Sequence, residues 1–311
     1  MALSNVASSV RHVLSGVDDG QSRIVNRIRE PAGAPGWFVP GDAIWTVHGS
    51  VATFLGGIRS ILLQSLHPLA LAGVNRHSTF REDPFGRLQR TGAFIAATTF
   101  GSTELAEQTV AGIRRLHDRV SGTLDDGRTY SANDPRLLQW VHVTLVDSML
   151  TAYERFGRDG YVPADAYVRD MAVVGRAMGV AEPPQTRAEL TELLDSYLPE
   201  LAGGSPAVAV KQFVLAAPLP PRLRMGYRML SRTALDTLPE WARDMLEHHP
   251  SGALVRARGL GTGLVLRILK AALVKSPAQA AGETRLAGLT ALPSAGSTQQ
   301  SNPGPVLEPQ Q

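Results

Sequence analysis

Apolar side chains recur along most of this chain with the 3.6-residue period of amphipathic helices, and the period-2 alternation of strands is nearly absent. Asp83 and Asp134 each precede a proline, which places an N-cap acceptor before a residue suited to the first helical position. Thr186 and Glu189 have the spacing of a capping box. The pattern predicts an all-α fold. The expected helices cover residues 42–65, 68–78, 84–100, 103–122, 135–156, 164–178, 187–197, 205–216, 221–236 and 239–247.

Changes of composition divide the chain into four parts. Residues 1–35 are largely polar and predict a loosely ordered leader. Residues 36–250 hold the helical pattern and predict one globular domain, and residues 251–275 form a basic, amphipathic segment. From 276 to 311 Pro, Ser, Gly, Ala and Gln dominate, which predicts a disordered tail.

The chain contains no cysteine. This excludes disulfides, a catalytic thiol, iron–sulfur clusters held by cysteine, and haem ligated by a thiolate. Any metal must therefore be held by His, Asp, Glu, Tyr or Met side chains.

The net charge of +3 is unevenly distributed. Between His248 and Gly282 there are five basic residues and no acid, so the rest of the chain is slightly acidic. This distribution argues against nucleic-acid binding. The basic segment 253–275 has two interpretations: it binds an anionic membrane surface, or it covers the core and leaves its cations in water. Its glycines weaken an isolated helix and slightly favour the second interpretation.

The first twenty residues lack the apolar run of a secretory signal, and no stretch reaches the ~20 continuous apolar residues of a membrane-spanning helix. We expect a cytoplasmic protein, associated with a membrane if segment 253–275 binds lipid.

Two histidines lie on the apolar faces of expected helices. His142 follows Leu138 by four residues, and His117 follows Ile113 by four, so both imidazoles point toward the core. A buried imidazole needs partners for its nitrogens. From spacing alone, hydrogen bonding within the core is the commoner explanation of either position, and a metal ligand is the alternative.

Other candidate groups cluster between residues 67 and 91. Arg87 and Thr91 are one helical turn apart, and Arg90 lies on a neighbouring edge. A guanidinium next to a hydroxyl can clamp a carboxylate, although an arginine on a solvated face is the commoner case. His67 sits before the Pro68 helix break, and His77 lies in a polar run. We assign no role to His12, His48, His248 and His249.

Three blocks of sequence resemble the family of rubber oxygenases (latex-clearing proteins) and MpaB-type oxygenases. The first block is Gln64–Gly101, and the second is Ser131–Gly157, which contains the sequence Trp-Val-His. The third block is an Arg-x-x-His-x-x-Val motif centred on His117. The resemblance covers about residues 36–245.

The resemblance implies an all-α protein built around a buried b-type haem. It implies that His117 is the iron ligand and His142 a second histidine of the pocket, with His142 as the alternative ligand. Arg87 and Thr91 match the family's arginine and threonine beside the haem, where they suit propionate binding or polarisation of dioxygen. Arg90 takes the place of a lysine in the same turn.

The sequence departs from the family at one place. Rubber oxygenases are thought to use a distal glutamate upstream of the arginine–threonine helix, whereas Ile61–Val74 contains no acid. We therefore expect His67 or His77 to be the distal catalytic group, and rubber cleavage by the same mechanism is not expected.

The resemblance thus implies a haem b-dependent oxygenase with dioxygen as co-substrate. It would oxidise, or cleave at a C=C bond, a small apolar substrate such as an isoprenoid or another lipid. No protein partner is inferred. Two alternatives remain: a non-catalytic haem-binding or gas-sensing protein, and a haem-free helical protein that docks on membranes through residues 253–275.

Overall fold

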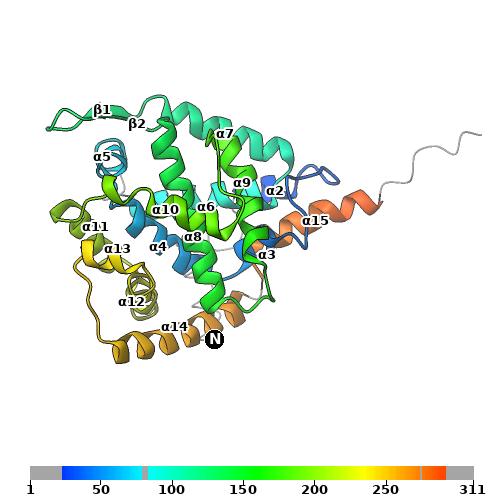
Figure 1. The fold of residues 1–311 in the computed structure, drawn as a ribbon. Helices are drawn as coiled ribbons and strands as arrows, with labels where there is room; N and C mark the ends of the chain where they lie inside the picture. Colours follow the sequence, from blue (N-terminus) through cyan, green and yellow to red (C-terminus); the bar gives the residue numbers. More distant parts are fainter. Residues whose placement is uncertain (1–22, 79–82, 274, 292–311) are drawn as a thin grey trace, which may run out of the picture.

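The chain folds almost entirely into helices, as the periodicity predicts (Figure 1). The computed structural model describes residues 23–78, 83–273 and 275–291. The helices are α2 (Arg23–Arg29), α3 (Ala43–Gly49), α4 (Thr53–Gln64), α5 (Pro68–His77), α6 (Pro84–Phe100), α7 (Thr103–His117), α8 (Pro135–Phe156), α9 (Ala164–Met178), α10 (Arg187–Asp195), the 3-10 turn η1 (Leu198–Glu200), α11 (Ser205–Leu215), α12 (Pro221–Asp236), α13 (Glu240–Met245), α14 (Gly252–Leu273) and α15 (Pro277–Ala291). One antiparallel hairpin, β1 (Ser121–Thr123) and β2 (Thr129–Ser131), is the sheet within the described residues, and Ser121 lies opposite Ser131.

The predicted helix starts are confirmed by their hydrogen bonds. The Asp83 carboxylate accepts from the backbone N–H of Gly86 at 2.8 Å. The Asp134 carboxylate accepts from that of Arg136, also at 2.8 Å. The Thr186 hydroxyl accepts from the backbone N–H of Glu189 at 3.2 Å. These caps satisfy backbone N–H groups that a helix leaves without partners.

Helix α8 runs through the middle of the molecule, and two clusters of buried side chains meet around it (Figure 1). One cluster joins α8 to α3 and α9 and includes Trp45, Trp140 and Tyr167. The other joins α4 to α11, α12 and α14 and includes Leu62 and Leu235. Because α4 and α8 pack against each other, the clusters belong to a single domain.

Two expected helices differ from the structure. The helix expected over 42–65 is divided into α3 and α4, because Ser50 is extended and its carbonyl accepts from the Thr53 hydroxyl at 2.7 Å. The helix expected over 103–122 ends at His117, where the chain turns into β1. One backbone hydrogen bond, from the Ala132 N–H to the Val120 carbonyl at 2.8 Å, extends the hairpin toward the end of α7.

The expectation of a disordered tail over 276–311 is wrong for Pro277–Ala291, which form α15. Ala278 and Ala281 are buried in the core, and a Cβ on Gly282 would lie 2.8 Å from the Phe100 carbonyl oxygen. The small residues that suggest disorder in the sequence therefore allow close packing against α6. The leader expected over 1–35 likewise contains α2, with two buried apolar side chains. Residues 1–22 and 292–311 lie outside the described residues.

The basic segment forms one continuous helix, α14, in spite of its glycines. Its inner face packs on α12 and the core through Leu266 and Leu269, and the hydroxyls of Thr262 and Thr233 lie 2.8 Å apart. Among the described helices, none combines the length and the apolar character needed to span a bilayer.

Candidate functional site

A cavity of 2780 Å³ is lined by residues of α4, α5, α6, α7, α8 and α9, and also by residues of α12 and α14. Most of its lining is apolar, including Phe94, Ile113, Leu145 and Val174. Ligand pockets usually measure about 300–1,000 Å³, so this one has room for a large cofactor together with a substrate. Five of the predicted site residues line this cavity: His77, Arg90, Thr91, His117 and His142.

His142 is a buried imidazole without a hydrogen-bond partner for Nε2 among the described residues. It lies on α8 against Gly175 of α9, where a Cβ would be 2.9 Å from Nε2 and 2.8 Å from Cε1. Burial lowers the pKa of His142 to about 4, so the ring is neutral near pH 7. Because Gly175 has no side chain, the ring of His142 can occupy this space.

His117 is the last residue of α7 and is half-buried. Its Nδ1 is enclosed and has no hydrogen-bond partner among the described residues. The residue as a whole lines the cavity. Burial lowers the pKa of His117, and the nearby Asp118 carboxylate partly opposes this shift. The ring is therefore neutral near pH 7 and has a free nitrogen at the cavity.

The α6 side of the cavity carries polar groups. Arg90 and Thr91 are exposed and line it, and a guanidinium nitrogen of Arg90 lies 3.6 Å from the Asp83 carboxylate. Arg87 lies one turn before Thr91 on the same helix, but its side chain is outside the described part of the structure. The predicted clamp between Arg87 and Thr91 therefore stays a prediction.

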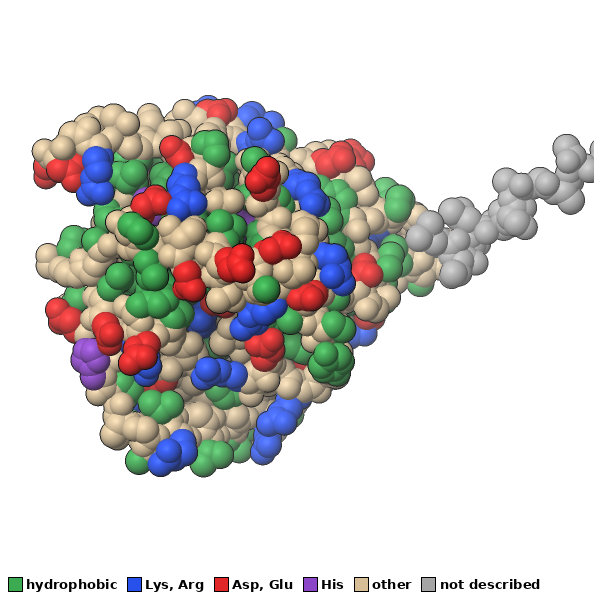
Figure 2. Space-filling view, viewed as in Figure 1, with side chains coloured by type: hydrophobic (Ala, Val, Ile, Leu, Met, Phe, Trp, Pro, Cys, Tyr) green, Lys and Arg blue, Asp and Glu red, His purple; other side chains and the backbone are tan. Residues whose placement is uncertain are grey.

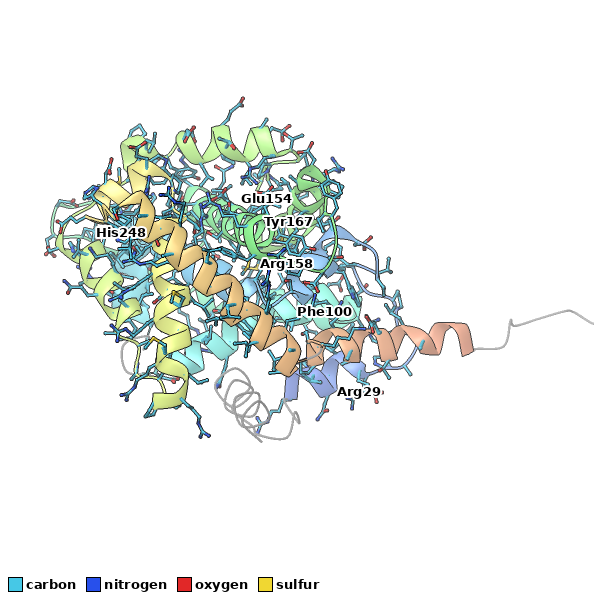
Figure 3. The ribbon with its side chains drawn as sticks, turned by 90° about the horizontal axis from the view of Figure 1, so that it is seen from below. Arg29, Phe100, Glu154, Arg158, Tyr167 and His248 are labelled. Atoms are coloured by element: carbon cyan, nitrogen blue, oxygen red, sulfur yellow. The ribbon has the colours of Figure 1, made fainter. Side chains whose placement is uncertain are left out.

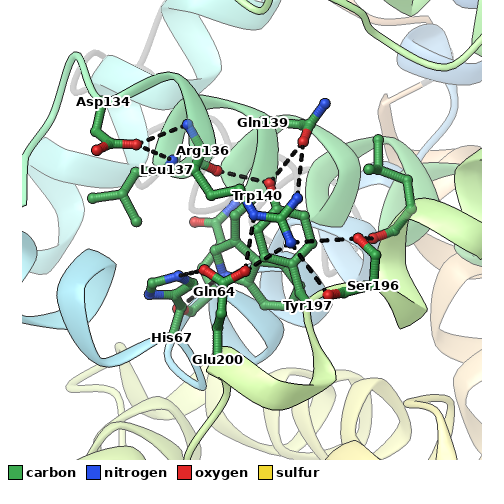
Figure 4. Close-up of polar contacts among 11 residues, drawn as sticks. Gln64, His67, Asp134, Arg136, Leu137, Gln139, Trp140, Ser196, Tyr197 and Glu200 are labelled. Carbon is green, nitrogen blue, oxygen red and sulfur yellow. Dashed lines mark hydrogen bonds and ion pairs between the residues drawn. The ribbon is translucent and has the colours of Figure 1, made fainter.

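The two candidate distal histidines have different environments. His77, at the end of α5, is exposed and lines the cavity, with Nε2 3.1 Å from the Tyr130 hydroxyl. His67 is buried and is not among the residues that line the cavity. Figure 4 shows it in a separate polar cluster, with Nε2 3.4 Å from the carboxylate of Glu200.

That cluster has its own structural role. Arg136 pairs with Glu200 at 2.7 Å, and its guanidinium lies 3.6 Å from the ring centroid of Tyr197 (Figure 4). The Tyr197 hydroxyl donates to the backbone carbonyl of Arg136 at 2.8 Å. Desolvation of the imidazole lowers the pKa of His67, although Glu200 opposes this effect. The structure thus ties His67 to η1 and the start of α8, away from the histidines of the cavity.

His48 also lines the cavity, although the sequence suggested no role for it. Its Nδ1 lies 2.7 Å from the Thr99 hydroxyl and its Nε2 lies 2.9 Å from the Tyr167 hydroxyl. Burial lowers its pKa to about 3. The signal in the sequence is its position four residues after Ile44 on an apolar helix face. Because both nitrogens have partners, His48 is part of the cavity wall rather than a free ligand.

A second buried polar group was also missed by sequence reasoning. The Arg59 guanidinium donates to the Asp147 carboxylate at 2.5 Å and to the Ser148 hydroxyl at 2.9 Å. Asp147 lies among the apolar residues of α8, which is the signal that marks it. The pair is buried and lies outside the cavity lining.

The lining of the cavity thus combines two neutral imidazoles, a guanidinium and a hydroxyl with many apolar side chains. This arrangement suits a flat, largely apolar cofactor that has carboxylate groups at one edge. Within the described residues, no three His, Asp or Glu side chains converge to hold a metal ion by themselves.

The fold and the cavity define a mostly helical protein with a large, mainly apolar cavity that several histidines line. Residues 45–268 match the family described as "ER-bound oxygenase mpaB/B'/Rubber oxygenase, catalytic domain". The match spans most of the chain, from α3 to α14, so the chain belongs to this family and is an oxygenase-type enzyme. This confirms the resemblance inferred from the sequence. Comparison with curated proteins gave no match, and comparison with solved structures gave none.

Proposed function

We propose that the protein is a haem b-dependent oxygenase that uses dioxygen to oxidise an apolar substrate, an isoprenoid or another lipid, by oxygen insertion or by cleavage of a C=C bond. Membership of the family supports the oxygenase class. The observation that carries the haem proposal is the pair of neutral imidazoles, His117 and His142, each with an enclosed nitrogen that has no hydrogen-bond partner among the described residues.

We assign the iron ligand to His117. His117 stands in the Arg-x-x-His-x-x-Val motif that resembles the family, whereas the ring of His142 packs against Gly175 of α9. A chain without cysteine has no thiolate to offer, and a neutral imidazole would hold the iron instead. When bound, the haem would supply the one-electron and dioxygen chemistry that protein side chains lack. His142 would then be the second histidine of the pocket.

The other residues of the cavity would bind the haem and hold the substrate. Arg90 and Thr91 line the cavity from α6, where a guanidinium and a hydroxyl suit the carboxylates of the haem. The same role for Arg87 is proposed from the sequence resemblance alone. The apolar walls exclude water and hold an apolar substrate. His77 takes the place of the distal group: it lines the cavity and its Nε2 can exchange a proton with the Tyr130 hydroxyl. His67 is bonded to Glu200 instead.

Absorption spectroscopy tests the cofactor and its ligand. Purified protein reconstituted with haem is expected to show a Soret band that His117→Ala abolishes or shifts, because the substitution removes the axial nitrogen. His249→Ala, at an exposed histidine paired with Asp244, should leave the band unchanged. If His142→Ala alone changes the band, the two histidines exchange roles. If neither substitution changes it, the proposed site is wrong.

Dioxygen uptake tests the reaction. Reduced, haem-loaded protein is expected to consume dioxygen when an apolar alkene such as squalene is added. A Soret band without dioxygen consumption across apolar alkenes and lipid extracts would contradict the proposed reaction and leave a haem-binding protein.

A further inference from the structure

The outer face of α14 carries a row of exposed aliphatic side chains. Leu260, Leu264 and Ile268 follow one another at four-residue spacing and are 80%, 57% and 43% exposed. The opposite face holds Leu266 and Leu269 in the core. Single exposed leucines are common on protein surfaces, but a row along one helix face makes a contiguous apolar patch.

The structure neutralises part of the positive charge of this helix. Arg258 pairs with Asp236 at 3.0 Å. Lys270 pairs with Asp159 at 2.6 Å. Lys275, just after the helix, pairs with Glu283.

The remaining two basic residues, Arg256 and Arg267, are exposed and form no ion pair with any described residue. On a helix of 3.6 residues per turn, both lie along one border of the Leu260–Leu264–Ile268 row. The free cations of α14 therefore border its apolar row.

Helix α12 extends this surface with more unpaired cations. It packs beside α14, which crosses the face seen in Figure 3. Its exposed side chains include Met225, Arg228 and Arg232, and neither arginine forms an ion pair with a described residue. The one acid of α12, Asp236, is buried.

We call this surface the α12–α14 face. It comprises Arg222, Met225, Arg228, Arg232, Arg256, Leu260, Leu264, Arg267 and Ile268. In Figure 2, basic and hydrophobic side chains lie along the lower edge of the molecule, where Figure 1 places α14.

We infer that the α12–α14 face docks on an anionic lipid bilayer. Arginines at this face lie at the level of the lipid phosphates, while the leucines and isoleucine of the apolar row enter the boundary between headgroups and acyl chains. A second copy of this chain is a poor occupant, because a symmetric contact would place the same cations opposite each other. A nucleic acid would leave the apolar row without a suitable contact.

The cavity ends at the same surface. Arg222 and Ile268 of the α12–α14 face also line the cavity, together with Leu223 and Val265. An apolar molecule dissolved in the bilayer would thus lie next to one end of the cavity. The docking itself does not depend on the proposed function, because binding to vesicles requires neither haem nor turnover.

Vesicle sedimentation with the full-length chain tests the inference. The chain is expected to bind phosphatidylcholine vesicles that contain phosphatidylglycerol and to stay in solution with phosphatidylcholine alone. A combined Arg228→Gln, Arg256→Gln and Arg267→Gln variant should bind about a hundredfold more weakly, at about fivefold for each cation. The matched control neutralises Arg115, Arg119 and Arg169, which are exposed on or next to α7 and α9, and should bind like the unchanged chain.

A fluorescent label tests which surface meets the lipid. Because the chain has no cysteine, a Leu264→Cys variant can carry a single environment-sensitive fluorophore. Its emission should shift to the blue on addition of the anionic vesicles, whereas a label at Val173→Cys, 40% exposed on α9, should not respond.

Several results would overturn the inference: equal binding to both kinds of vesicle, equal weakening by the control variant, no shift at position 264, or binding to a DNA duplex without binding to vesicles. Far-UV circular dichroism of each variant distinguishes lost binding from lost folding.

Discussion

Three of the histidines that line the cavity differ in their hydrogen-bond partners. His48 has a hydroxyl at each ring nitrogen, whereas His117 and His142 each keep an enclosed nitrogen without a partner among the described residues. Burial disfavours the charged form of all three, so burial does not distinguish them. An unsatisfied buried nitrogen is costly, and a ligand that binds it removes that cost. The partners therefore separate a structural imidazole from the two candidate ligands.

The environment of His48 predicts a dependence of stability on pH. In the unfolded chain its pKa is near 6.5, and in the folded chain it is about 3. Between these values the unfolded state binds the additional proton, so the free energy of unfolding falls as the pH is lowered from 6.5 toward 3. Urea denaturation over this range should show that His48→Gln removes a slope of about 1.4 kcal/mol per pH unit.

His249→Gln is the control for this measurement, because that imidazole is exposed. An unchanged slope in the His48→Gln variant would show that the buried imidazole is not the source of the pH dependence.

At the scale of elements, α15 shows how a sequence of small residues can form part of a core. Ala278 and Ala281 are buried, and Gly282 allows the helix to approach Phe100. The Arg285 side chain is fully buried, and its guanidinium donates to three backbone carbonyls, those of Ala34, Phe100 and Gly101. One arginine thus ties α15 to the end of α6 and to the segment before α3.

Replacement of Arg285 should weaken this attachment. In an Arg285→Met variant, buried carbonyls lose their donors, and each lost hydrogen bond to a charged group contributes about 1.5–3 kcal/mol. We expect the free energy of unfolding to fall by at least about 2 kcal/mol in urea denaturation. Arg115→Met, at an exposed position on α7, should change it by less than about 0.5 kcal/mol. An equal effect of both variants would contradict the structural role of Arg285.

At the scale of the whole molecule, a buried ion pair joins the two core clusters. Arg59 of α4 pairs with Asp147 of α8, and its Nε donates to the Thr237 carbonyl at the end of α12. Desolvation lowers the pKa of Arg59, and the Asp147 carboxylate opposes that shift and keeps the guanidinium charged. Three helices are thus connected through one polar group in an apolar interior.

Removal of one partner should destabilise the protein more than removal of both. Asp147→Ala leaves a buried charge without its counter-ion, and we expect a loss of about 3–5 kcal/mol in the free energy of unfolding. The double variant Arg59→Met with Asp147→Leu removes both charges and should recover part of that loss. Urea denaturation measures both effects. A double variant less stable than Asp147→Ala would show that the ion pair itself is net stabilising.

Much of the fold could be predicted because its signals are local. Helix caps such as Asp134 act within three residues, and the apolar faces of α7 and α8 follow from periodicity. The end of α7 at His117 and the helix α15 were not predictable in this way. The hairpin that follows α7 and the close contact of α15 with α6 depend on residues distant in sequence.

For the candidate site too, some features follow from the sequence and others only from the fold. The sequence by itself determined the helical class, the exclusion of a thiolate as the ligand of any haem, and the direction of His117 and His142 toward the core. Only the tertiary structure decided which residues share a cavity: it includes His48 and His77 and leaves out His67.

The charges of α14 show why the contacts of a side chain depend on the tertiary structure. In the sequence the segment holds five basic residues without an acid, yet Asp159, Asp236 and Glu283 pair with three of them in the fold. A periodic pattern orients a side chain because the helix geometry is local. The ion-pair partner of that side chain depends on packing. Residues up to about a hundred positions apart, such as Lys270 and Asp159, come within a few ångströms of each other only when the chain has folded.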